Sequence, residues 1–234
     1  MANRSRVVHL ALKVADLERA TRFYEDAFGF RQTGTGHARG HISRHMTDGA
    51  FDLALMVYDS EDVHEAQLSG PGPCIHHWGI EVADREATIT EIEANGGTII
   101  SNPNEGALKF RAPDGTIAEI VRAGRYRKAS SDDRARIQGL AISAADTHKA
   151  SRFYQSVFGF EEVPGAGAQL TDGAFRISLL EGAPLARPGH DHWTIRVSDV
   201  SSFGKAVEQH GGVRQGPEFI YRTPDGSLLQ LAQE

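Results

Sequence analysis

Apolar and polar residues alternate along several short stretches of the chain, and the first such stretch is followed by a segment with helical spacing. In residues 6–14 (RVVHLALKV) every second side chain is large and apolar, which predicts a half-buried β-strand. Residues 17–28 repeat apolar side chains every three to four positions, which predicts a helix between Asp16 as N-cap and Gly29 as C-terminal stop. Short strands separated by glycines follow, so one module is a strand, a helix and three strands.

This module recurs, and internal repeats of this kind decide the fold. A second module begins at residue 76, with Asp84 as its helix N-cap, and the second half of the chain repeats both modules. The matching segments are 6–30 with 136–160, 76–84 with 191–199, and 110–121 with 221–232.

We therefore predict an α+β protein of four βαβββ modules paired into two domains, each a curved, mainly antiparallel sheet with helices outside. A first domain at 1–124 contains two modules, and a second at 136–234 contains the other two. The polar and charged residues 125–135 between them are expected to be a linker.

Composition narrows the function classes. The net charge of −6 is spread along 234 residues, and no basic run suggests a nucleic-acid partner. The N-terminus has no apolar signal core and no stretch is long enough to span a bilayer, so we expect no membrane partner. Cys74 is the single cysteine, which excludes internal disulfides and favours the cytoplasm.

Strand alternation places three possible metal ligands on one face of the predicted first sheet. His9 lies on the first strand, opposite the large apolar side chains that should face the helices, and His77 holds the same position on the fifth strand. Glu119 lies on the last strand of the domain. The neighbouring residues Ala11 and Gly79 are small, so this face leaves room for something other than protein.

The four-module layout, the helix ends FYEDAFGF and FYQSVFGF, and the PDG turns resemble the vicinal oxygen chelate superfamily. The resemblance covers almost the whole chain and implies the fold predicted above. That superfamily contains several chemistries, so the function has to come from the residues of the site.

The metal-liganding positions of that superfamily match His9, His77 and Glu119. A fourth ligand of metal-dependent glyoxalases would fall at about Leu55, which cannot bind a metal. The resemblance is therefore to type I extradiol ring-cleavage dioxygenases, in which His45 matches a catalytic acid–base histidine. Two imidazoles and one carboxylate leave three positions open on Fe(II) for substrate and O₂, with Mn(II) as the other metal to consider.

Those enzymes tend to carry a tyrosine ten residues before the glutamate, where this chain has Lys109. A lysine there can pair with an anionic group of the substrate. The resemblance thus implies an Fe(II)-dependent dioxygenase that cleaves a small, catechol-like diol with O₂ as co-substrate, and Lys109 would suit a diol with an anionic substituent. We expect it to act in the cytoplasm as a homo-oligomer.

The second half of the chain lacks most of these chemical groups. Its residues at the positions of His9, His45, His77 and Glu119 are Gly139, Gln169, His192 and Gln230. We therefore expect metal in the first domain only and a degenerate second domain. The first domain is also longer around the site, and its extra residues are expected to form entrance loops.

Two other function classes remain open at this point. One is a metal-dependent, glyoxalase-like isomerase or lyase that uses the metal as a Lewis acid. The other is a resistance protein that sequesters a small molecule. His76 is a rival to His77 as a ligand, and the spacing of His37, His41 and His45 would suit a metal site only on a helix, which the glycines around them disfavour.

Overall fold

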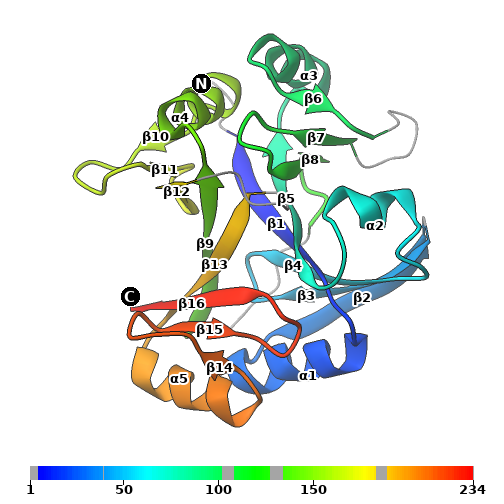
Figure 1. Ribbon diagram of the computed structural model, residues 1–234, viewed down its shortest axis with the longest axis vertical. Coiled ribbons are helices and arrows are strands. Elements are labelled where there is room, and N and C mark those ends of the chain that lie inside the picture. The colour runs from blue at the N-terminus through cyan, green and yellow to red at the C-terminus, as the bar shows by residue number, and fades with distance from the viewer. Residues whose placement is uncertain (1–4, 39, 102–107, 127–133, 183–188, 234) are drawn as a thin grey trace. The chain divides into compact units, whose positions relative to one another are not determined.

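The computed structural model describes residues 5–38, 40–101, 108–126, 134–182 and 189–233 (Figure 1). Most of the predicted linker, residues 127–133, lies outside this described part. The described residues form two mixed sheets of eight strands each, and each sheet is made from one half of the chain.

The strand order within a sheet is the same in both halves. The first sheet has the order β2-β3-β4-β1-β5-β8-β7-β6 and the second β10-β11-β12-β9-β13-β16-β15-β14. The strands of the first sheet are β1 (Arg6–Lys13), β2 (Arg31–Ala38), β3 (His41–Thr47), β4 (Asp52–Tyr58), β5 (Cys74–Val82), β6 (Thr98–Ile99), β7 (Leu108–Arg111) and β8 (Ile117–Arg122). Those of the second are β9 (Ala135–Ala144), β10 (Glu161–Glu162), β11 (Gln169–Thr171), β12 (Arg176–Glu181), β13 (His190–Val197), β14 (Val213–Arg214), β15 (Ile220–Arg222) and β16 (Leu228–Gln233).

Each module has one main helix, and the first half has an additional short one. The helices are α1 (Leu17–Phe28), α2 (His64–Leu68), α3 (Arg85–Ala94), α4 (Thr147–Phe158) and α5 (Val200–Gln209). Within each module the last strand pairs in parallel with the first and the other pairs are antiparallel, so the predicted four βαβββ modules are confirmed. In the described part of the chain, every helix is too short or too polar to traverse a bilayer.

The predicted helix boundaries follow from local chemistry. The Asp16 carboxylate accepts a hydrogen bond from the backbone N–H of Arg19, which begins α1, and Gly29 ends it in the left-handed region at φ 70°. The Asp84 carboxylate caps α3 by accepting from the backbone N–H groups of Glu86 and Ala87. These caps were readable from sequence because they depend only on neighbouring residues.

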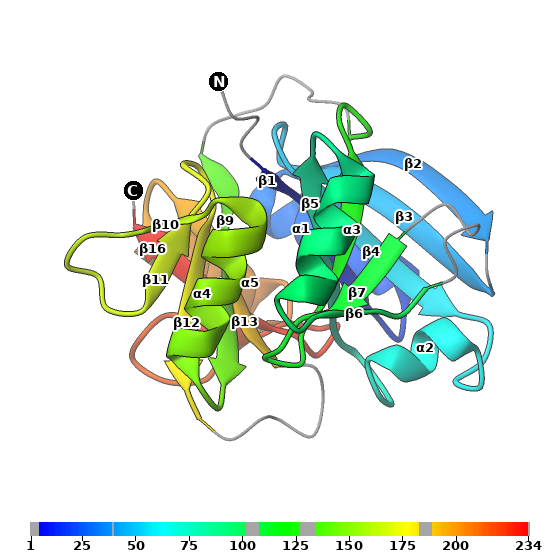
Figure 2. The ribbon, with the colours of Figure 1, turned by 90° about the horizontal axis from the view of Figure 1, so that it is seen from above.

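The chain divides into two compact units, and each unit contains residues from both sheets. One unit contains the residues up to Val8 with His77–Arg125 and Gly139–Asp191, and the other contains His9–His76, Tyr126–Gln138 and His192–Glu234. Helices α3 and α4 contact each other in the first unit, and α1 and α5 contact each other in the second (Figures 1 and 2). Each unit therefore combines modules from both halves, and the predicted boundaries at 124 and 136 stay a prediction.

A hydrogen-bonded tyrosine–aspartate pair joins the two modules of each unit. In one unit the Tyr154 hydroxyl donates to Asp114 Oδ2 at 2.6 Å, and in the other the Tyr24 hydroxyl donates to Asp225 Oδ2 at 2.6 Å. Both tyrosines come from the FY sequence of a helix and both aspartates from a PDG turn. The motifs that repeat in the sequence are thus partners in packing.

Tyr154→Phe is expected to lower the free energy of unfolding by about 1–3 kcal/mol, because the Asp114 carboxylate would lose the hydrogen bond that the buried Tyr154 hydroxyl donates to its Oδ2. Tyr24→Phe should cost about the same, since its contact with Asp225 has the same length. Urea unfolding of both variants measures this. A loss below about 0.5 kcal/mol in both variants would contradict the structural role of the pair.

The repeated TDGAF turn also connects the two halves. The Asp48 carboxylate accepts from the backbone N–H of Ile137 at 2.7 Å, and the Asp172 carboxylate accepts from the backbone N–H of Val7 at 2.7 Å. Each turn therefore holds the first strand of the other half. Because both turns make this contact, the TDGAF sequence is the same in both copies, although the residues beside it differ.

The extra residues of the first half are more regular than expected. They lengthen the hairpin of β2 and β3 and add helix α2, whereas the second half has only the short strands β10 and β11 at the hairpin. Buried Lys13 holds the α2 segment, because its Nζ donates to Glu61 Oε2 at 2.5 Å and to the Gly70 carbonyl at 3.1 Å. The expectation of entrance loops here is wrong for most of these residues.

Candidate metal centre

His9 is held in place by a carboxylate on the neighbouring strand. Strands β1 and β4 are parallel and place His9 directly opposite Asp52. His9 Nδ1 lies 2.6 Å from Asp52 Oδ2, and both side chains are buried. Asp52 also contacts His45 on β3. The Nδ1 atom of His45 lies 2.9 Å from the same Asp52 oxygen.

The charge on Asp52 decides which nitrogen of each imidazole is available. Burial raises the pKa of Asp52, but hydrogen bonds and charge from His45 and His9 outweigh it and hold the pKa below its usual value. An ionised carboxylate only accepts, so both histidines donate from Nδ1. Neutral His9 and His45 then carry a lone pair on Nε2, and for His9 that is a nitrogen able to bind a metal.

His77 and Glu119 form the other part of the candidate site. His77 lies on β5 and Glu119 on β8, two parallel strands that pair Gly79 with Glu119. His77 Nε2 lies 3.2 Å from Glu119 Oε2. Glu119 Oε1 is buried and has no hydrogen-bond partner in the described part of the chain, which is a costly arrangement for a carboxylate unless a cation is bound.

The three predicted ligands come together. One ligand atom each from His9, His77 and Glu119 can be chosen so that all lie within 4.8 Å of one another, and the residues are only 2%, 2% and 4% exposed. Two neutral imidazoles and a carboxylate suit a divalent first-row metal ion. The orphan oxygen of Glu119 and the fixed tautomer of His9 both fit such an ion.

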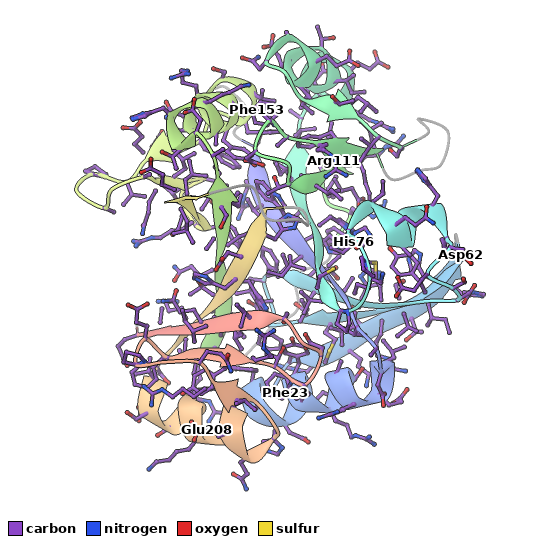
Figure 3. All side chains as sticks on the ribbon, viewed as in Figure 1. Phe23, Asp62, His76, Arg111, Phe153 and Glu208 are labelled. Atoms are coloured by element: carbon purple, nitrogen blue, oxygen red, sulfur yellow. The ribbon has the colours of Figure 1, made fainter. Side chains whose placement is uncertain are left out.

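Of the two rival histidines on β5, only His77 belongs to this donor set. His76, labelled in Figure 3 beside helix α2, places its Nε2 at 2.8 Å from the Glu65 carbonyl and 3.1 Å from the Tyr58 hydroxyl. These contacts tie His76 to the α2 segment. His76 therefore has a packing role.

The position expected for a fourth ligand faces away from the donors. Leu55 pairs with Leu12, on the face of the sheet opposite His9. The residues of β4 that share the face of His9 and Asp52 are Ala54, Met56 and Tyr58. Ala54 and Met56 form a small apolar cluster with Ala11, and Tyr58 packs against it. The neighbouring carboxylate, Asp52, binds the Nδ1 atoms of the two histidines.

Lys109 lies directly opposite Glu119 in the antiparallel pair of β7 and β8. Opposed residues of such a pair share one face, so the lysine side chain starts beside a member of the candidate donor set. Lys109 is buried, and its backbone N–H donates to Ser101 Oγ at 2.7 Å. This register places Lys109 next to Glu119, and its pairing with a substrate anion stays a prediction.

Two residues of the site were missed from the sequence. Asp52 follows the first TDGAF turn, where the second copy has Arg176, and this exchange was a usable signal. In the second sheet Arg176 pairs with Gly139 just as Asp52 pairs with His9, so the exchange removes both partners together. Tyr126 lies in the predicted linker, but its ring stacks on His9, and no sequence pattern distinguishes it from the other linker residues.

Comparison with known proteins agrees with the fold. Residues 6–120 match the family model described as the Glyoxalase/Bleomycin resistance protein/Dioxygenase superfamily. A probable lactoylglutathione lyase of Arabidopsis thaliana chloroplasts is 23% identical over 176 residues, which are 68% of this chain and 45% of that protein. The match thus spans less than half of the length of that relative.

Solved structures with both chemistries have similar folds. The Mn(II)-bound glyoxalase from Novosphingobium aromaticivorans superposes with a TM-score of 0.72 at 18% identity, covering 100% of this chain and 83% of that one. The 2,3-dioxygenase LapB from Pseudomonas sp. KL28 has a TM-score of 0.64 at 13% identity, covering 100% and 93%.

Fold and donor set together define a repeat protein of βαβββ modules with a buried site for a divalent metal ion. Residues 6–120, just under half of the chain, belong to the glyoxalase, bleomycin resistance protein and dioxygenase superfamily. The chain as a whole shares its fold with the two solved structures.

Proposed function

We propose that this protein is an Fe(II)-dependent extradiol dioxygenase that cleaves a catechol-like ring with O₂. The observation that carries the proposal is the separation of roles around Asp52. His9 belongs to the donor set, whereas His45 is held by the same carboxylate and stays outside it. A metal site with three protein donors and a neighbouring histidine base suits a substrate that must lose protons as it binds.

His9, His77 and Glu119 would hold the ion, with Mn(II) as the alternative to Fe(II). Three protein ligands leave positions for a diol and for O₂. Bound Fe(II) would supply the redox chemistry that lets a catechol react with O₂.

His45 would take up the proton that a catechol hydroxyl loses on binding. Its Nδ1 is held by Asp52, so Nε2 carries the lone pair in the neutral ring. When Nε2 is protonated, the ionised Asp52 stabilises the imidazolium, and the same proton can be returned to the ring-opened product. Asp52 thus orients the base and is not itself expected to change protonation state.

Lys109 would favour a substrate with an anionic group. Lys109→Met should raise the KM of an anionic catechol, such as a catechol carboxylate, more than that of unsubstituted catechol. The difference should correspond to about 1 kcal/mol, or about fivefold, and more if the pair is desolvated. Steady-state kinetics on both substrates measures it, and equal changes for the two would count against this role.

A lyase or isomerase of the glyoxalase type is the second candidate, because the Arabidopsis relative is described as a probable lactoylglutathione lyase. Such an enzyme would use the ion as a Lewis acid and consume no O₂. A metal-dependent glyoxalase would have a fourth metal ligand on β4. Its expected position is Leu55, and the neighbouring Ala54 and Met56 are also apolar, so β4 offers no such ligand there, which favours the dioxygenase.

Anaerobic reconstitution with Fe(II) separates the two candidates. The loaded protein is given a panel of catechols, and O₂ uptake is recorded together with the yellow colour of a ring-opened product. Stoichiometric O₂ uptake that needs Fe(II) would support the proposal. Turnover of the hemithioacetal of methylglyoxal and glutathione without O₂, and inertness toward all catechols, would establish the lyase instead.

A further inference from the structure

Tyr126 contacts the metal site from the segment that joins the two repeats. Its ring stacks on the imidazole of His9, with centroids 4.7 Å apart and planes at 12°. The same ring lies 6.1 Å from the ring of His45, and the two histidine rings are 6.2 Å apart. Tyr126 therefore completes a cluster of three rings, of which the two imidazoles also contact Asp52.

Stacking of Tyr126 on His9 restrains a motion of the imidazole that the hydrogen bond to Asp52 does not restrain. The contact between Nδ1 and Asp52 fixes one edge of the imidazole, but the ring can still rock about the axis of that bond. An aromatic ring parallel to its face opposes this motion, because rocking would bring the two rings into collision on one side. The direction of Nε2 then depends on both neighbours.

We propose that Tyr126 is a positioning residue of the metal centre: it holds the plane of the His9 imidazole and keeps water from one face of it. The inference rests on the metal site of the proposed function and assigns that site a further residue. This role depends on the aromatic ring of Tyr126 and not on its hydroxyl. Phenylalanine at this position should therefore preserve the role, and alanine should abolish it.

Metal release tests this role without any measurement of turnover. The full chain is loaded with Co(II), and loss of the cobalt absorption is followed after addition of excess EDTA. Tyr126→Ala should release the ion about 10–100-fold faster than the unmodified protein, which is the range found when residues that orient metal ligands are removed. Tyr126→Phe should match the unmodified protein within about twofold, and Arg125→Ala, at the exposed neighbouring position, should match it as well.

The metal-free protein gives a second readout. The Nδ1 proton of His9 is buried and bound to Asp52, so it should exchange slowly and give a resolved NMR signal in ¹⁵N-histidine-labelled protein, assigned with His9→Gln. Tyr126→Ala should broaden or abolish the signal, and Tyr126→Phe should keep it.

The outcomes distinguish this role from the metal site itself. An unchanged His9 signal and unchanged cobalt release in Tyr126→Ala would overturn the role of Tyr126 while leaving the proposed function intact. Loss of both in Tyr126→Phe would also overturn it, since the hydroxyl and not the stack would then hold His9. Failure of the unmodified protein to bind Co(II) would remove the metal centre and the proposed function.

Discussion

Glu119→Gln is expected to weaken metal binding by roughly 10²-fold or more, so that the purified chain loses its ion. Removing a residue that only orients a metal ligand costs about 10–100-fold in affinity, and removing a charged ligand should cost at least as much. The buried Oε1 of Glu119 has no hydrogen-bond partner among the described residues, so the carboxylate is placed at an energetic cost that a bound cation would offset. The neutral amide of glutamine cannot offer the same charge.

The fold should survive this change, because the second sheet already has Gln230 at the equivalent position. Elemental analysis of the full chain is the measurement, with circular dichroism and thermal melting as the check on folding. Isolated halves are unsuitable, since each compact unit combines modules from both. Gln230→Ala is the matched control and should keep one ion per chain. A folded Glu119→Gln variant with a full complement of metal would show that the donor set is misassigned.

The fold was predictable because its signals are local and repeated. Alternation set the strands, Asp16 and Asp84 set the starts of two helices, and repetition set the number of modules. The donor set was predictable for a related reason: strand alternation decides which face each side chain occupies, and His9, His77 and Glu119 all occupy the same face.

Contacts that depend on register or on distant segments were not predictable. Asp52 contacts His9 because β4 pairs with β1 in one particular register, which alternation alone does not specify. Tyr126 reaches His9 from a segment with the composition of a linker. The pairing of Tyr24 with Asp225 likewise spans almost the whole chain, although both residues belong to motifs that the repeats made visible.

The substitution of Gln169 for His45 between the two copies now has a structural context. The turn that follows each residue is kept because Asp48 and Asp172 hold backbone N–H groups of the opposite half. His45 and Gln169 precede the turn and do not hold the opposite half in this way. The residue at this position can therefore differ between the two sheets according to the chemistry of each. Asp52, the partner of His45, is exchanged together with it, for Arg176.

His45→Gln is therefore expected to keep the fold and the metal while kcat for ring cleavage falls by about 10²–10⁴-fold, the usual contribution of a general acid–base group. A glutamine amide can still donate a hydrogen bond to Asp52, so Asp52 should stay in position beside His9. The amide cannot accept and return a proton near neutral pH, which is the role proposed for Nε2 of His45.

Three measurements decide the assignment of His45: metal content, catechol binding under anaerobic conditions, and kcat from O₂ uptake. Metal content and catechol binding should change little, since His45 lies outside the donor set. The decrease should appear in kcat. Gln169→Ala, at the matching position of the second sheet, is the control and should leave kcat unchanged. Loss of metal in His45→Gln would make His45 a ligand and require a new donor set. Full turnover would make it an ordinary strand residue, and the proton would then have to be taken by another group.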